Sequence, residues 1–92
     1  MTKEGSVTKA TNWYKRYLHL APQDQQIELK DYFNAGEVAI AFTTLVELIV
    51  DEGVMGQVEE DDVENLAFLL SEMHVASGKA TRLVEAADSQ RR

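Results

Sequence analysis

Cysteine is absent from the 92-residue sequence, and proline occurs only once. Without cysteine there is neither a disulfide scaffold nor a thiolate metal site, so folding does not depend on an oxidising compartment. No apolar run approaches the roughly 20 residues of a membrane-spanning helix, and the N-terminal MTKEGSVTKA lacks the hydrophobic segment of a secretory signal. We therefore expect a cytoplasmic protein with no membrane as its partner.

The residues that usually carry catalysis are also scarce. His19 and His74 are the only histidines, they do not have H-x-x-x-H spacing, and no serine lies in a nucleophile-elbow motif. Carboxylates are plentiful, but acid/base catalysis needs them buried and unequal, and here they cluster where solvent would keep them ionised. The sequence thus predicts a protein that is not an enzyme and that has no catalytic residues, metal or cofactor.

Basic residues are missing from the middle of the chain. Residues 31–78 contain no Lys or Arg and carry a charge of −11, whereas residues 1–30 and 79–92 each carry +2. Nucleic acids and anionic membranes bind basic surfaces, so this distribution argues against both as partners. It favours a protein partner with a basic surface, although the acidic residues of a small domain can also serve only its solubility.

The spacing of the apolar residues predicts helices, because they recur at intervals of three and four rather than two. We expect an all-α fold, a single small bundle of four to five helices over residues 1–92, with 1–7 and 89–92 frayed and the chain a monomer or a weak homodimer. The predicted helices are Thr8–Leu20, Pro22–Ala35, Glu37–Asp51, one that begins within Glu59–Asp62 and ends near Met73, and a short one after Ser77-Gly78.

The helix over Glu37–Asp51 has the widest apolar stripe and is predicted to be the most buried. The core expected around it consists of Val38, Phe42, Leu45, Ile49, Leu66 and Leu70. Two further sets are expected to face inward: Ile27, Leu29, Tyr32 and Phe33 on the second helix, and Val63, Leu66, Ala67, Leu70 and Met73 on the fourth. Trp13, Tyr14 and Tyr17 on the first helix are expected in the core or as its lid, with an exposed partner contact as the alternative.

The stretch VDEGVMGQVEEDD, residues 50–62, places acidic residues on both sides of a short turn. Read as a calcium loop starting at Asp51, it has Gly53 and Met55 at the third and fifth places, which need side-chain oxygens, so calcium is not expected. Capping and the helix dipole explain part of the acidity, and Asp61 and Glu64 have the spacing of a capping box. Four adjacent carboxylates nevertheless exceed what one helix end needs.

We therefore predict that a basic partner docks on this turn and on the helix that precedes it. The flexible glycine-containing turn is expected to present Met55 as an adaptable apolar contact amid the charges. The predicted partner-binding residues are Glu37, Glu47, Asp51, Glu52, Met55, Glu59, Glu60, Asp61 and Asp62.

The run from Leu20 to Val75 resembles the small helical immunity proteins of bacterial toxin systems, in particular the MafI-like group. The likeness rests on Gly36-Glu37 after an apolar helix, on Ala41 and Leu45 before an acidic helix end, on Val58 before Glu59, and on a last helix ending in Met73. The resemblance implies binding and neutralisation of a cognate toxin domain, often a nuclease, inside the producing cell. The alternative is another acidic interaction module, such as a regulator that mimics nucleic acid and blocks a DNA-binding protein.

Overall fold

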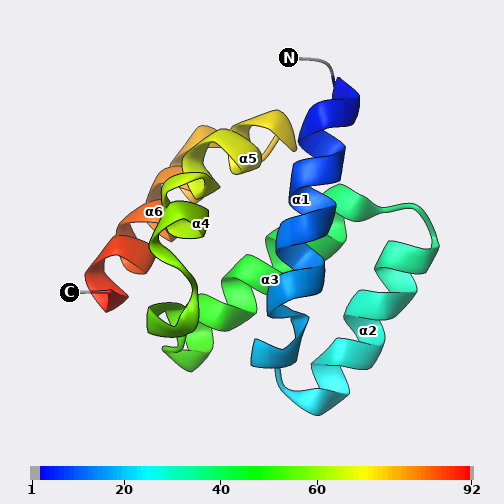
Figure 1. The fold of residues 1–92 in the computed structure, drawn as a ribbon, viewed down its shortest axis with the longest axis horizontal. Helices are drawn as coiled ribbons and strands as arrows, with labels where there is room; N and C mark the ends of the chain where they lie inside the picture. The colour runs from blue at the N-terminus through cyan, green and yellow to red at the C-terminus, as the bar shows by residue number, and fades with distance from the viewer. Residues whose placement is uncertain (1–2, 92) are drawn as a thin grey trace.

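The computed structural model describes residues 3–91, with side chains from residue 5 onward, and the secondary structure of this part is helical throughout (Figure 1). The all-α prediction is confirmed. The elements are α1 (Lys3–Tyr17), the 3-10 helix η1 (Leu18–Leu20), α2 (Gln23–Asn34), α3 (Val38–Glu52), the 3-10 helix η2 (Met55–Gln57), α4 (Glu60–Glu64), α5 (Leu66–Glu72) and α6 (Ser77–Gln90). No helix in this part of the chain is long and apolar enough to cross a membrane.

Helix α3 is the centre of the packing. It contacts α1, α2 and α6, and α1 lies across it (Figure 1). Its buried residues are Ala41, Phe42, Leu45, Val46 and Ile49, which follow the spacing of a helix face. The Trp13 ring meets the Phe42 ring edge-on, with centroids 5.4 Å apart, so one aromatic contact joins α1 to the middle of α3.

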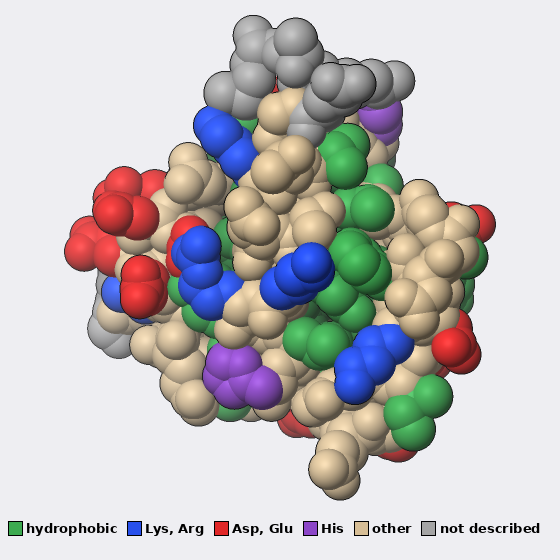
Figure 2. Space-filling model, turned by 45° about the vertical axis from the view of Figure 1, so that its right-hand side comes forward, with side chains coloured by type: hydrophobic (Ala, Val, Ile, Leu, Met, Phe, Trp, Pro, Cys, Tyr) green, Lys and Arg blue, Asp and Glu red, His purple; other side chains and the backbone are tan. Residues whose placement is uncertain are grey.

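Helices α1 and α2 pair through a second aromatic contact. The rings of Tyr14 and Phe33 are stacked, with centroids 4.7 Å apart and planes 9° from parallel. Figure 2 shows hydrophobic side chains reaching the surface in a strip on this face of the molecule. Trp13, Tyr14 and Tyr17 are all buried, so the prediction that they belong to the core is confirmed.

The helix boundaries follow the residues with special backbone preferences. Pro22 immediately precedes α2, where its fixed φ suits a helix start. Gly36 follows α2 with a left-handed φ of 83°, and the N–H groups of Gly36 and Glu37 donate to the carbonyls of Phe33 and Tyr32. The predicted glycine cap at the end of the second helix is therefore confirmed.

The count of helices differs from the prediction because the fourth helix is interrupted. The chain leaves α4 at Asn65 and starts α5 at Leu66, where a single helix was expected. The interruption changes which residues face inward: Leu69 is buried, whereas Ala67, predicted to be buried, is exposed. Asparagine has a weak helix propensity, which fits a break at this position.

One further prediction of an inward-facing apolar residue was wrong, and one is confirmed only in part. Ile27 of α2 is 67% exposed and does not face the core. Val38 is only partly buried, because it lies at the first turn of α3, near the edge of the bundle. The other predicted core residues, including Leu45 and Leu70, are fully buried.

The chain ends are more ordered than expected. Helix α1 starts at Lys3 rather than Thr8, and the buried Ser6 hydroxyl donates to Glu72 of α5 over 2.7 Å. Helix α6 continues to Gln90, so residues 89–91 are not the frayed tail that we expected. The remaining residues of the predicted frayed ends, Met1, Thr2 and Arg92, lie outside the described residues.

Truncating Leu45 to alanine should lower the free energy of unfolding by ~2–5 kcal/mol, because the side chain is completely buried and leaves a cavity. The matched control is Ile27→Ala, which removes a similar side chain from the exposed face of α2 and should change stability by less than ~0.5 kcal/mol. Urea denaturation of both variants measures the difference. A loss below 1 kcal/mol at Leu45, on the rough scale for core truncation, would contradict its placement.

Candidate protein-binding surface

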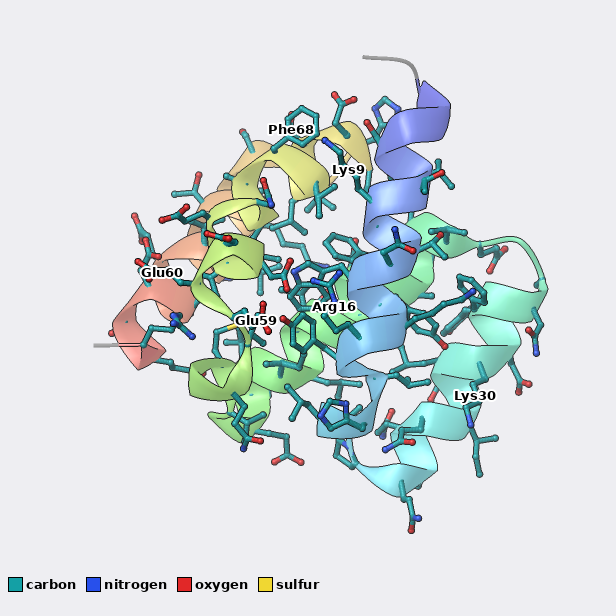
Figure 3. The ribbon with its side chains drawn as sticks, in the orientation of Figure 1. Lys9, Arg16, Lys30, Glu59, Glu60 and Phe68 are labelled. Atoms are coloured by element: carbon teal, nitrogen blue, oxygen red, sulfur yellow. The ribbon has the colours of Figure 1, made fainter. Side chains whose placement is uncertain are left out.

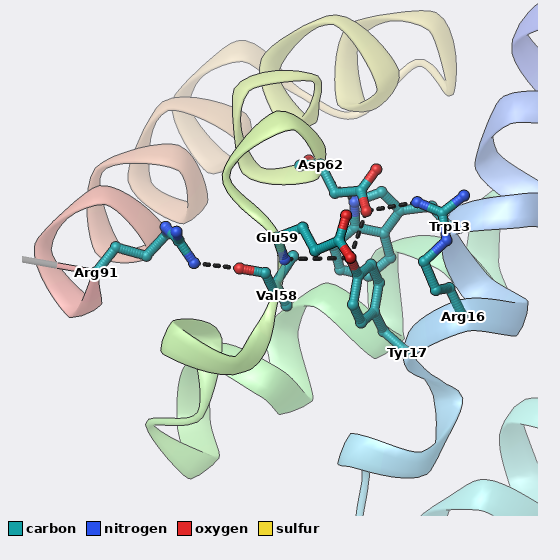
Figure 4. Close-up of polar contacts among 7 residues, drawn as sticks. All are labelled: Trp13, Arg16, Tyr17, Val58, Glu59, Asp62 and Arg91. Carbon is teal, nitrogen blue, oxygen red and sulfur yellow. Dashed lines mark hydrogen bonds and ion pairs between the residues drawn. The ribbon is translucent and has the colours of Figure 1, made fainter.

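The turn between α3 and α4 is fastened to the end of α6. Gly53 ends α3 with a left-handed φ of 70°, and the chain then forms η2. The Gln90 side chain donates to the Val50 carbonyl over 2.8 Å and accepts from the Met55 N–H over 3.3 Å. Arg91 donates to the Val58 carbonyl (Figure 4). The turn is thus bonded on the side that faces α6.

Met55 does not have the exposed position that we predicted. Its side chain is 0% exposed and belongs to the hydrophobic core. The bonds from Gln90 and Arg91 hold the turn against α6, and this arrangement directs the methionine inward. The expectation of a flexible turn that presents Met55 to a partner was therefore wrong.

The start of α4 is fastened to α1 from the opposite side (Figure 4). The Asp62 carboxylate accepts hydrogen bonds from the Arg16 guanidinium and from the Tyr17 hydroxyl. The Trp13 indole N–H donates to the Asp62 carbonyl over 3.0 Å, and the Glu59 N–H donates to the Tyr17 hydroxyl over 3.1 Å. Asp62 thus joins α4 to three side chains of α1 that lie within about one and a half helical turns, Trp13, Arg16 and Tyr17.

The Asp62 side chain is only 13% exposed and is used by the fold. It is one of the nine predicted partner-binding residues, and its carboxylate is already shared by two donors from α1. Asp62 therefore supports the surface and is not free to meet a partner's basic group. The predicted capping box is also wrong: Glu59 precedes α4, and no side chain caps this helix start.

Glu59, Glu60, Asp61 and Glu64 form what we call the acidic edge. All four are exposed, and none has a side-chain hydrogen bond or ion pair within the described residues. Glu59 lies toward α1, whereas Glu60 lies toward α6 (Figure 3). In Figure 2 acidic side chains gather on the side of the molecule that carries α4, with basic side chains beside them.

The acidic edge extends onto α6, which was not expected from the sequence. Glu60, Glu64 and Asp88 line a surface hollow together with Val63 and Arg91. Arg91 uses its guanidinium to bond the carbonyls of Gly56 and Val58. Asp88 lies in a C-terminal segment of net positive charge, so the charge distribution along the chain gave no signal for its position.

The other predicted partner residues lie apart from the acidic edge. Asp51 and Glu52 are exposed at the end of α3, on the other side of the turn. Glu47 forms an ion pair with Lys79 of α6 over 2.6 Å. Glu37 precedes the first residue of α3, so it lies at the opposite end of that helix. The nine predicted partner-binding residues therefore do not form one continuous surface in the structure.

Basic and aromatic side chains of α1 border the acidic edge. The Lys9 ammonium lies 5.7 Å from the centre of the Phe68 ring, and both residues line a hollow with Arg16 and Asn65. Sequence reasoning did not include Arg16 or Phe68 in the site. Only the tertiary fold places them beside α4, because α2 and α3 separate Arg16 from it and the break at Asn65 separates Phe68 from it.

The two histidines lie in different elements. His19 belongs to η1 and is exposed, whereas His74 follows α5 and has a left-handed φ of 62°. Among residues 3–91, no three His, Cys, Asp or Glu side chains lie close enough together to hold a metal ion. The absence of a metal and of catalysis stays a prediction.

Comparisons with known protein families, with curated proteins and with solved structures found no match to this chain. The likeness to the MafI-like immunity proteins therefore stays a prediction from the sequence.

Replacing Asp62 by alanine should destabilise the fold by about 1–3 kcal/mol, because the buried Tyr17 hydroxyl loses its acceptor. The half-exposed Arg16 contributes little to this loss, since solvent screens its ion pair. Asp61→Ala is the matched control, because its side chain is exposed and unbonded, and it should have almost no effect. Thermal unfolding followed by circular dichroism distinguishes the two variants, and equal losses would contradict the role of Asp62.

The stability of the fold should fall in strongly alkaline solution. Burial raises the pKa of Tyr14, and burial together with the hydrogen bond to Asp62 raises the pKa of Tyr17. A tyrosine whose pKa is raised by folding contributes to the stability of the fold. This contribution is fully present below the unfolded pKa of about 10, and it is lost as the pH rises through the pKa of the folded state. Phenylalanine at either position should reduce the loss of stability between pH 9 and 12, measured by urea denaturation. An unchanged pH dependence in the Tyr14→Phe, Tyr17→Phe double variant would contradict this cause.

Proposed function

We propose that the protein is an immunity protein that binds and neutralises a bacterial toxin domain through the acidic edge. The toxin domain would present a basic surface, as nucleases do to hold phosphate. The observation that supports the proposal is the acidic edge itself: four exposed carboxylates with no side-chain partner among the described residues, in a 48-residue interval that has no Lys or Arg. The resemblance of Leu20–Val75 to the immunity proteins supports it independently.

The physics of such an interface favours this arrangement. Opposite charges steer two proteins together and raise the association rate, and close charge pairs at one known nuclease–inhibitor interface couple by ~1.5–7 kcal/mol. Adjacent carboxylates also repel one another in the free protein, and a basic surface relieves that repulsion. Both effects need carboxylates that the fold does not use, which Glu59, Glu60 and Asp61 provide.

The fold holds the acidic edge in place before any partner arrives. Asp62 fastens α4 to α1, and Arg91 fastens the preceding turn to α6. A rigid binding surface loses less conformational entropy when it binds, so more of the interaction free energy appears as affinity. A short helix of five residues has little stability of its own, and these tertiary bonds supply it.

The test is to replace Glu59, Glu60 and Asp61 together by lysine and to measure binding to a toxin domain sought in the reading frame next to the gene. Association should slow by at least about tenfold, with a larger loss at low than at high salt, because steering is screened. The same variant should fail to protect cells that express the toxin. The matched control changes the exposed Asp24, Glu28 and Asp31 of α2 to lysine, an equal charge change away from α4.

Three results would contradict the proposal. Equal losses in the two triple variants would show a general effect of net charge. Unchanged binding of the α4 variant would place the partner elsewhere on the chain. A wild-type protein that does not protect against the neighbouring toxin, and that instead blocks a neighbouring DNA-binding regulator, would favour the nucleic-acid mimic.

A further inference from the structure

A groove runs along the start of α3, and it is lined by the beginning of α1 and by the turn that joins α5 to α6. Its deepest part is a cavity of about 370 Å³ with mostly apolar walls. The residues that form the walls are Val7, Val38, Ala39, Ile40 and Met73, together with the rim residues Glu37, Glu72 and His74. None of them belongs to the acidic edge.

Exposed aliphatic side chains gather in this groove. Ile40 is 46% exposed and Val7 is 38% exposed, and they are two of the four large hydrophobic side chains that the described surface exposes. Ile40 lies on α3 outside the set of fully buried residues, so part of its aliphatic side chain stays in contact with water. Apolar side chains that collect in one hollow mark a place where another molecule can bury them.

The rim of the cavity is acidic. Glu72 is held in position by the buried Ser6 hydroxyl, which donates to its carboxylate over 2.7 Å. Glu37 is exposed and has no side-chain partner within the described residues. Among the described residues that line this cavity, none is Lys or Arg. The charge of the rim therefore selects a basic occupant.

The groove is long enough for a helix. Beyond His74 it continues into a second hollow along α3, lined by Ile40, Thr43 and Thr44, and it ends at the Glu47–Lys79 ion pair. The ten-residue step from Glu37 to Glu47 corresponds to ~15 Å at 1.5 Å per residue, or about three helical turns. The floor is apolar around Val38 and Ile40 and more polar along Thr43 and Thr44, so its first part fits the apolar face of an amphipathic helix.

We propose that this groove docks an amphipathic helical segment of a partner protein, with aliphatic side chains against Ile40 and Val7 and with Lys or Arg beside Glu37 and Glu72. The recognition mode is a helix in a groove, in which apolar residues at helical spacing supply the affinity and the charged flanks set the orientation. This inference does not depend on the proposed immunity function, because it uses other residues and requires no toxin.

A designed peptide tests the groove directly. The probe is a helix of about three turns, the length of the groove, with leucine along one face and lysine on both flanks, and its control carries glutamate in place of lysine. Backbone amide shifts of the full-length protein, followed by NMR during titration, should move most at Ala39, Ile40 and His74. The lysine peptide should bind at least about tenfold more tightly than the glutamate peptide, with the difference shrinking in high salt.

Matched variants show whether the peptide binds in the groove or is attracted by hydrophobic and charged side chains elsewhere on the surface. Ile40→Asp should weaken binding of the lysine peptide by at least about tenfold, because an aliphatic anchor is lost. Ile27→Asp introduces the same change at another exposed isoleucine, on α2, and should leave binding unchanged. Glu37→Gln should weaken binding less than Ile40→Asp and should reduce its salt dependence.

Each of three outcomes would contradict the groove proposal and would leave the proposed function of the acidic edge unaffected. Shifts centred on Glu59, Glu60 and Asp61 would show that the peptide is attracted only by the acidic edge. No saturable shifts with millimolar peptide would show that the groove is not a docking site. Sedimentation that reveals a dimer, abolished by Ile40→Asp but not by Ile27→Asp, would identify a second copy of the chain as the occupant.

Discussion

The hydrogen bonds between Asp62 and α1 are the constraint on which the rest of this surface depends. They connect residues that are 45 to 49 positions apart and hold a helix of five residues against the bundle. Val63 packs the other side of α4 into the core, and the bonds of Asp62 add the polar attachment to α1. A separate bond from the Glu59 N–H to the Tyr17 hydroxyl attaches the residue just before α4 to the same helix.

Acidic residues that are adjacent in the sequence have different roles in this fold. Asp62 is shared by two donors from α1, whereas its neighbours Glu60 and Asp61 are exposed to solvent. The separation follows from helical geometry, since successive residues point about 100° apart around the axis. One residue of four can therefore serve the fold while the others stay available, and this division keeps the stability of the domain largely independent of the charges at its surface.

The sequence predicts the helices of this protein much better than it predicts the site. Helical periodicity, Pro22 and Gly36 determine where α2 and α3 begin and end, because these signals are local. The break at Asn65 and the inward position of Met55 depend on contacts with α1 and α6, and distant contacts leave no periodic signal in the chain. Asp88 illustrates the same limit, since only the packing of α6 beside α4 brings it to the acidic edge.

The bonds from the end of α6 to the turn after α3 also determine the order in which the domain can assemble. Gln90 and Arg91 form hydrogen bonds with residues that lie 33 to 40 positions earlier in the chain, so these two residues are synthesised long after their partners. During synthesis α1, α2 and α3 can pair as soon as they emerge, because their contacts need nothing that follows. The bonds that hold the turn after α3 against α6 cannot form until Gln90 and Arg91 have left the ribosome, so this side of the acidic edge reaches its final arrangement after α1, α2 and α3 can pair.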